Sequence, residues 1–257
     1  MPILMYHEVY RPEERLRLRR LTNPAYNIEL GGFRKQMAFL SENNVATLTI
    51  DEILTQDAAP VKKAVSLTFD DGWQGNYYHA LPILQEYGFK ATFFVATDLI
   101  GKPLYMTWEQ LKEMQSSGMS MQSHTVSHRP LGAIEDKDIL FELSESKKVI
   151  EEKLGSVVQH LSLPHGSKEP RIWPIARNAG YRSISTSDVG FARNGSPGPW
   201  LKRISIGDGI SEQRFRLIGE GQYRAISGMI ISKSLKNRSE TKCFLFQPSF
   251  CPISQHS

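Results

Sequence analysis

Two carboxylates and two imidazoles in this sequence have the types and spacing of a catalytic metal site. Asp70 and Asp71 end one apolar run, and His124 and His128 follow a second one. Two imidazoles and one carboxylate around a divalent ion leave positions open for water and for a substrate oxygen. The ion acidifies its bound water, and a second carboxylate nearby takes the proton as the water attacks a carbonyl. The four residues therefore have the chemistry of a metal-dependent hydrolase.

Each half of this set also has a simpler interpretation. Asp70-Asp71-Gly72 has ordinary turn composition, and a histidine pair at this spacing is more often surface or capping detail. Their joint occurrence favours a site, because residues 64–69 and 119–123 are typical of buried strands. Both pairs then follow strand carboxyl ends, where α/β folds build their sites.

Strand-like and helical segments alternate along the chain, which predicts an α/β fold, a single distorted (β/α) barrel of about seven strands. Asp51 is expected to cap the second helix. The expected strands are residues 2–6, 46–50, 64–69, 91–96, 119–123, 160–163, 181–186 and 201–206, and the expected helices are 33–43, 51–55, 76–87, 107–118, 135–154 and 171–179.

Length and composition predict one enzyme-sized domain. The chain has 257 residues, of which 40% are hydrophobic and 23% charged, enough for a full core. We expect this domain to span residues 1–218, followed by a weakly structured or disordered extension at 219–257, which is polar and lacks periodicity. Cys243 and Cys251 lie in this extension. Two cysteines do not make a disulfide framework, so they do not indicate whether the protein is found in an oxidising or a reducing compartment.

The formal net charge of +4 is modest. One basic run, Arg15 to Arg20, is interpreted as a solvated loop, so no nucleic-acid partner is expected. No apolar stretch is long enough to cross a membrane, and no leader pattern opens the sequence. We expect a cytoplasmic enzyme, or a secreted or periplasmic one if a leader has been removed. Protein partners cannot be predicted.

Four segments resemble the polysaccharide deacetylases of carbohydrate esterase family 4, which have the NodB-like fold. These segments are Ser66–Gly72, Ala91–Val95, Met106–His128 and Leu161–Gly166. The resemblance extends from residue 2 to about residue 210, and it is closest to the circularly permuted branch that acts on biofilm poly-N-acetylglucosamine. It implies hydrolysis of the acetamido group of N-acetylated sugars in a glycan, with one divalent ion. Zinc is the default, and iron, cobalt or nickel are alternatives.

Position by position, the resemblance implies Asp70 as general base and Asp71, His124 and His128 as metal ligands. Leu163-Pro164-His165-Gly166 is similar to the third family motif, in which the backbone N–H after the proline helps to hold the oxyanion. Pro164, His165 and Gly166 are therefore expected to bind substrate. His165 stands at the aromatic position of the motif, and it can equally be a simple loop residue.

Two departures from the family pattern bear on the mechanism. Ser162 stands where an arginine often orients the base. Arg203 resembles an arginine of the biofilm branch and is the candidate replacement, while an arginine at a solvated strand end is an equal alternative.

The second departure is that the usual C-terminal histidine motif is missing. His7, after the apolar segment Pro2 to Tyr6, resembles the N-terminal histidine that serves as general acid in the permuted branch. Such a permutation is reasonable because domain termini often lie close together.

Two other functions compete with the N-acetyl-sugar deacetylase. One is a catalytically silent carbohydrate-binding domain of the same fold, and the other is an O-acetyl esterase or small-amide hydrolase. The glycan and the oligomeric state cannot be predicted.

Overall fold

The fold positions the site with a ring of parallel strands. The structure is a computed structural model that describes residues 1–18, 22–55, 63–166, 168–191 and 199–221. Met1–Gly221 form one compact unit. Apart from 219–221, the predicted extension lies outside the described residues, and so do both cysteines.

Seven parallel strands close the barrel in the order β1-β10-β9-β8-β7-β6-β5, with β5 pairing back to β1. The predicted barrel is therefore confirmed. β4 joins only the first two residues of β5, and β2 pairs with β3 in a separate small sheet. The strands are β1 (Ile3–Tyr6), β2 (Val9–Tyr10), β3 (Ile28–Glu29), β4 (Ala46–Thr47), β5 (Ala64–Phe69), β6 (Thr92–Val95), β7 (Ser120–Ser123), β8 (His160–Ser162), β9 (Ser183–Val189) and β10 (Trp200–Ser205).

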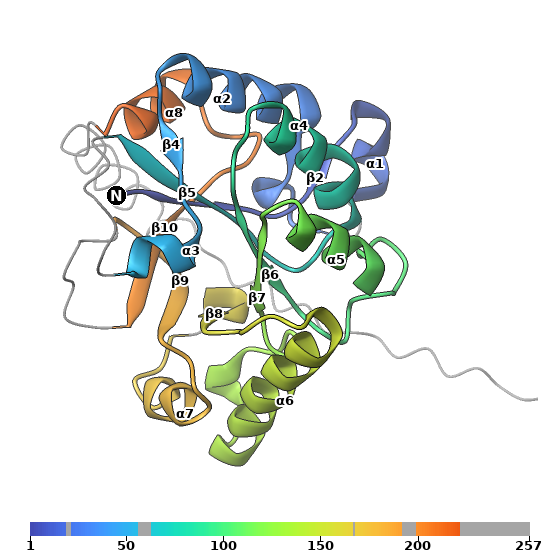
Figure 1. Cartoon of the computed structure of the whole chain (residues 1–257), viewed down its shortest axis with the longest axis vertical. Coiled ribbons are helices and arrows are strands. Elements are labelled where there is room, and N and C mark those ends of the chain that lie inside the picture. Colours follow the sequence, from blue (N-terminus) through green and yellow to red (C-terminus); the bar gives the residue numbers. More distant parts are fainter. Residues whose placement is uncertain (19–21, 56–62, 167, 192–198, 222–257) are drawn as a thin grey trace, which may run out of the picture. The chain divides into compact units, whose positions relative to one another are not determined.

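Helices surround this ring (Figure 1). The α-helices are α1 (Arg15–Leu18), α2 (Leu30–Glu42), α3 (Ile50–Leu54), α4 (Leu81–Glu86), α5 (Trp108–Ser116), α6 (Asp136–Leu154), α7 (Ile172–Asn178) and α8 (Glu212–Gly219). The shorter turns are η1 (Pro12–Glu14), η2 (Pro24–Tyr26), η3 (Asn76–Ala80), η4 (Leu131–Ala133) and η5 (Pro164–Gly166). Helix α8 was not predicted, and the predicted helix 76–87 begins as a π-helical turn. Among the described residues, no helix is both long and apolar enough to cross a membrane.

Residue alternation along β5 determines which side chains enter the barrel. Phe69 stacks on Tyr6 and Phe93 and meets Phe33 of α2, so its side of the strand packs against the helical layer. Neighbouring side chains in a strand point to opposite faces. Asp70, one position on, therefore turns toward the barrel interior, where the site lies.

Helix α3 closes the amino-terminal end of the barrel. Ile50 forms a buried apolar cluster with Ile3, Phe94 and Leu201, which come from three different strands. The prediction that Asp51 caps this helix is wrong. Thr49 is the cap and exchanges hydrogen bonds with Glu52 in a capping box.

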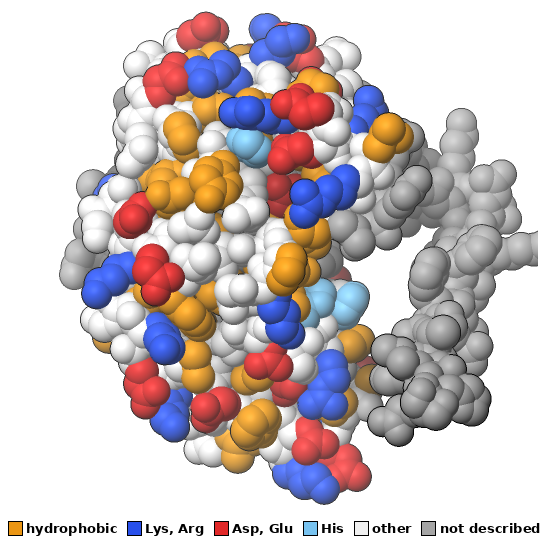
Figure 2. Space-filling view, turned by 90° about the vertical axis from the view of Figure 1, so that its right-hand side faces the viewer, with side chains coloured by type: hydrophobic (Ala, Val, Ile, Leu, Met, Phe, Trp, Pro, Cys, Tyr) orange, Lys and Arg blue, Asp and Glu red, His pale blue; other side chains and the backbone are white. Residues whose placement is uncertain are grey.

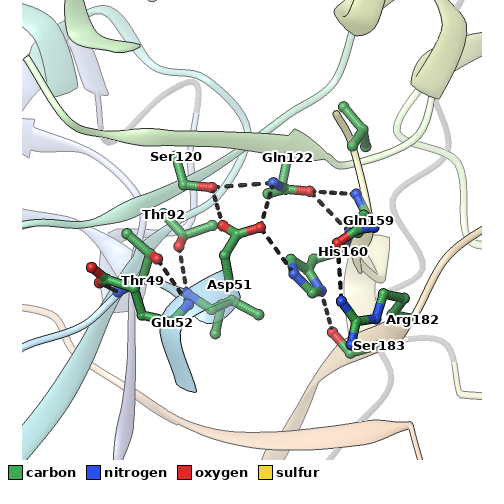
Figure 3. Close-up of polar contacts among 12 residues, drawn as sticks. Thr49, Asp51, Glu52, Thr92, Ser120, Gln122, Gln159, His160, Arg182 and Ser183 are labelled. Carbon is green, nitrogen blue, oxygen red and sulfur yellow. Dashed lines mark hydrogen bonds and ion pairs between the residues drawn. The ribbon is translucent and has the colours of Figure 1, made fainter. Parts of the chain in front are cut away.

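The Asp51 carboxylate instead ties α3 to the strands (Figure 3). It accepts a 2.6 Å hydrogen bond from Ser120, and its Oδ1 lies 3.2 Å from His160 Nε2. His160 Nδ1 in turn lies 2.9 Å from Ser183 Oγ, and the Gln122 side-chain oxygen accepts the His160 backbone N–H. These side chains supplement a β7–β8 ladder that has a single registered pair.

The surface around this core carries mixed charge. On the face shown in Figure 2, Lys and Arg side chains alternate with Asp and Glu, and no large patch of one sign is visible.

Asp51→Asn should destabilise the protein by about 1 kcal/mol near neutral pH. Burial opposes the ionised form, yet hydrogen bonds from His160 and Ser120 hold the pKa of Asp51 below its ordinary value of 3.8. A carboxyl group whose pKa is lower in the folded than in the unfolded state stabilises the fold at pH values above its unfolded-state pKa. This stabilisation is lost as the pH falls through the folded-state pKa. Urea unfolding of the wild type and the variant at about pH 7 and at about pH 2.5 should therefore show a shrinking difference in the free energy of unfolding. The exposed Asp98, as Asp98→Asn, is the control, and a difference independent of pH would contradict the assignment.

Candidate active site

A cavity of about 500 Å³ opens at the carboxyl ends of the strands. His7, Asp70, Asp71, His124, His128 and His165 all line it. They come from segments far apart in the sequence, so the barrel assembles most of the residues predicted from the sequence in one place. Arg203 lies buried beside Asp70, and Pro164 and Gly166 flank His165.

Asp71, His124 and His128 form a cluster of three ligand atoms within 4.8 Å of one another. The Nε2 atoms of His124 and His128 lie 3.2 Å and 3.1 Å from Asp71 Oδ1. Ligand atoms about 2.1 Å from a shared ion lie roughly 3.0–3.4 Å apart, for octahedral to tetrahedral angles. The spacing of the cluster therefore fits one small divalent ion.

The hydrogen bonds around the cluster also fit a cation. His124 Nδ1 lies 2.8 Å from the Ser162 carbonyl oxygen. Because a carbonyl only accepts, Nδ1 carries a proton, and Nε2, which faces Asp71, is the nitrogen that can ligate an ion. Trp73 Nε1 donates to Asp71 Oδ2 at 2.8 Å, while Asp71 Oδ1 is buried without a hydrogen-bond donor among the described residues. The ligand atoms of Asp71, His124 and His128 can each donate an electron pair, so a cation between them would be bound by all three.

Local electrostatics keep Asp71 in the ionised form that binds metals. Burial would raise the pKa of Asp71, but the imidazoles of His124 and His128 hold it well below its ordinary value. Trp73 was not singled out from the sequence, although it directly follows Asp70-Asp71-Gly72.

The backbone is strained at the candidate ligands and beside them. Asp71, Thr125, His128 and His165 have φ angles of +75°, +70°, +59° and +55°. Such angles are uncommon outside glycine and concentrate at functional sites. The two histidines do not share a helix face. They converge because the chain turns sharply between them.

Asp70 is held by Arg203 in a fully buried ion pair, so the alternative of a solvated arginine is wrong. Arg203 is 1% exposed, and its Nη1 and Nη2 each donate to one oxygen of Asp70 at 2.7 Å. The remaining guanidinium donors bond Thr186 O at 3.1 Å, Thr68 Oγ1 at 3.3 Å and Ser162 Oγ at 2.8 Å. A guanidinium has five N–H donors, and all of them have partners here.

Ser162 is therefore part of the arrangement that replaces the arginine of the third motif. Its hydroxyl donates to Asp70 Oδ2 at 3.0 Å while accepting from Arg203. Burial alone would raise the pKa of Asp70, but Arg203, with His124, holds it below its ordinary value. The carboxylate is therefore ionised and fixed in orientation.

His7 stacks against Tyr26 of η2, with ring centroids 4.6 Å apart. Its Nδ1 is buried without a hydrogen-bond partner among the described residues. Burial lowers the pKa of His7, although the carboxylates of Asp71 and Asp70 oppose this. Tyr26 had no distinguishing signal in the sequence, because only folding brings η2 beside the end of β1.

The third-motif segment forms one edge of the cavity. The His165 ring lies 4.8 Å from the His128 ring, and burial, with the nearby His128, lowers the pKa of His165. Pro164 is buried behind it. Gly166, at φ +63°, packs so closely that a Cβ there would lie 2.9 Å from Ser187.

Known proteins are similar to this chain in sequence and in fold. The sequence profile of the family described as polysaccharide deacetylase matches residues 57–184. A putative polysaccharide deacetylase of Bacillus subtilis, YxkH, is 32% identical over 218 residues, which are 84% of this chain and 74% of the relative. The poly-beta-1,6-N-acetyl-D-glucosamine N-deacetylase of Staphylococcus aureus is 23% identical over 203 residues, covering 73% of this chain and 70% of that protein.

Among solved structures, the Streptococcus pyogenes deacetylase PplD in complex with acetate is similar, with a TM-score of 0.76 and 30% identity. The likeness covers 86% of this chain and 97% of PplD. The fold is therefore shared with a solved deacetylase over nearly the whole length of that protein.

Arg203→Met should destabilise the protein by about 3–5 kcal/mol, because it leaves the Asp70 carboxylate buried without its cation. Adding Asp70→Asn removes the stranded charge, so the double variant should be more stable than the sum of the single losses predicts. Denaturant unfolding of both single variants and the double variant measures this coupling. Arg182→Met, at an exposed arginine, is the matched control. Strictly additive losses would show that the pair contributes no coupling.

Proposed function

Because this chain belongs to the polysaccharide deacetylase family, we propose that it hydrolyses the acetamido group of N-acetylated sugars in a glycan, using a divalent ion at Asp71, His124 and His128. The chain is thus a deacetylase hydrolase by family, and the metal and the residue roles are our proposal. One observation carries it. A carboxylate held by Arg203 lies next to a three-ligand cluster in the same cavity.

A divalent ion at this cluster would acidify a coordinated water and polarise the acetyl carbonyl. Two imidazoles and one carboxylate suit zinc first, with iron, cobalt or nickel as alternatives. The Ser162 carbonyl and the Trp73 indole would orient His124 and Asp71 toward the ion.

Asp70 is assigned as the general base. A carboxylate has about four acceptor positions, and the described contacts use one on Oδ1 and two on Oδ2. Oδ1 therefore keeps a lone pair that can accept the proton of the attacking water. Arg203 makes Asp70 a weak base but fixes its direction, and orientation is a large part of catalytic efficiency.

His7 is assigned as the general acid. As the carbon–nitrogen bond breaks, the sugar nitrogen needs a proton, since an amide nitrogen leaves poorly as an anion. His7 lines the same cavity as Asp70, and its buried Nδ1 leaves Nε2 as the nitrogen that can serve the substrate. Acetate and the free amine are the products. Pro164, His165 and Gly166 are assigned to the cavity edge that holds the substrate and the oxyanion.

N-acetylglucosamine polymers are the substrate class that we propose, supported by the named activity of the Staphylococcus aureus relative. The silent carbohydrate-binding alternative rested on the missing third-motif arginine. Arg203 is buried and bonds both oxygens of Asp70, which supports a base that is held in place, and no observation favours the alternative. Activity on O-acetyl esters is tested together with the role of His7.

The first test separates the metal ligands from the base. His124→Ala should lose bound metal and deacetylase activity together, whereas Asp70→Asn should keep the metal and lose about 10²–10⁴-fold in turnover. Metal content by elemental analysis and acetate release from N-acetylglucosamine oligomers are the measurements. His79→Ala, at a histidine that pairs with Glu14, is the control. Full metal occupancy in His124→Ala would refute the ligand assignment.

The second test concerns the acid. His7→Ala should reduce amide hydrolysis by about 10²–10⁴-fold. Hydrolysis of an activated acetyl ester should fall much less, because its alkoxide leaves without a proton. Metal content should stay unchanged. Equal losses on both substrates would assign His7 a structural role and reopen the search for the acid.

A further inference from the structure

A buried carboxylate on α6 has no part in the chemistry proposed above. Glu142 is 1% exposed, although it lies on a helix whose outer face is charged. Its Oε2 accepts the backbone N–H groups of Val126 and Ser127, each at 2.9 Å. Its Oε1 accepts from the Ser127 hydroxyl and, at 3.1 Å, from Arg129 Nη2. All four bonds go to the segment that carries His124 and His128 or directly follows it.

This segment has no strand or helix of its own to satisfy its backbone. Four successive backbone N–H groups, Thr125 to His128, donate to side-chain oxygens. The first bonds Ser123 Oγ, at the end of β7, and the last bonds Thr125 Oγ1, so both of these acceptors are close in the sequence. Glu142 receives the middle two and, of these three acceptor residues, is the one that comes from a distant element, α6.

The hydrogen bonds that Glu142 accepts are also stronger than those accepted by the hydroxyl groups of Ser123 and Thr125. Burial opposes its charge, yet bonds from Ser127 and Arg129 keep the pKa of Glu142 below its ordinary value. Hydrogen bonds to an ionised acceptor are roughly twice as strong as neutral ones. A buried backbone N–H that loses its acceptor destabilises the structure around it, because the group is left desolvated without a partner. Removing this side chain would leave two such groups unpaired in a turn already strained at Thr125 and His128.

We propose that Glu142 is a positioning residue of the metal site, holding the His124–His128 turn so that both Nε2 atoms face Asp71 Oδ1. This inference rests on the proposed function, because it presumes that these histidines bind a divalent ion. Glu142 acts through the backbone of the turn, and it touches neither the ion nor the substrate.

The test measures metal affinity and coordination separately from activity. Zn²⁺ affinity is determined by competition with a chromophoric chelator, and the Co²⁺-loaded protein is followed by its visible absorption. Glu142→Ala should lower the Zn²⁺ affinity by about 10–100-fold and change the Co²⁺ spectrum. Glu142→Gln keeps one acceptor oxygen for the two N–H groups but loses the charge, so a smaller loss in the same direction is expected. Glu152→Ala, at an exposed glutamate on the same helix, should match wild type.

Thermal unfolding of the metal-free variants identifies general loss of structure. If Glu142→Ala does not fold, Glu142→Gln decides, and wild-type affinity in that variant overturns the proposal. Wild-type affinity in a folded Glu142→Ala overturns it as well. Failure of the wild-type protein to bind Zn²⁺, or unchanged binding in His124→Ala, would instead refute the ligand assignment itself. The two failures are therefore distinguishable.

Discussion

The site depends on one interaction, the buried ion pair between Asp70 and Arg203. Desolvating two charges is expensive, and the interior repays this only where geometry is good and every remaining donor is satisfied. Both conditions hold, because the guanidinium bonds both carboxylate oxygens and its other donors reach Thr68, Ser162 and Thr186. These partners stand on β5, β8 and β9 or at their ends, so closing the barrel is a condition for satisfying the pair.

The barrel interior is divided accordingly. At the amino ends of the strands, Ile50 of α3 fills the interior with Ile3, Phe94 and Leu201. At the carboxyl ends the interior is polar, and Arg203 lies with its guanidinium 5.7 Å from the Phe94 ring at the boundary. The apolar half supplies the packing, which allows the polar half to hold strained turns and buried charges.

Sequence reasoning found the residues whose signals are local. Asp70, Asp71 and the two histidines follow apolar runs directly, so strand patterns were enough to place them at one edge of the sheet. Arg203 entered only through resemblance, because its partner lies 133 residues away. Glu142 looks like any acidic residue of an amphipathic helix, and Asp51 was assigned to a cap because its tertiary partners, Ser120 and His160, could not be seen. In each case a long-range contact decided the role.

The place of β1 in the ring has a consequence for how the chain is made. β1 lies between β5 and β10, and its residue Leu4 pairs with Ile204, about 200 positions later. Because synthesis starts at the amino end, nearly the whole domain must be made before β1 can pair with both β5 and β10. Contacts of such sequence separation slow folding and leave strand edges open meanwhile. Asp70 likewise has no cation until β10 emerges, so a nascent chain that already contains every proposed metal ligand still lacks the charge that completes its interior.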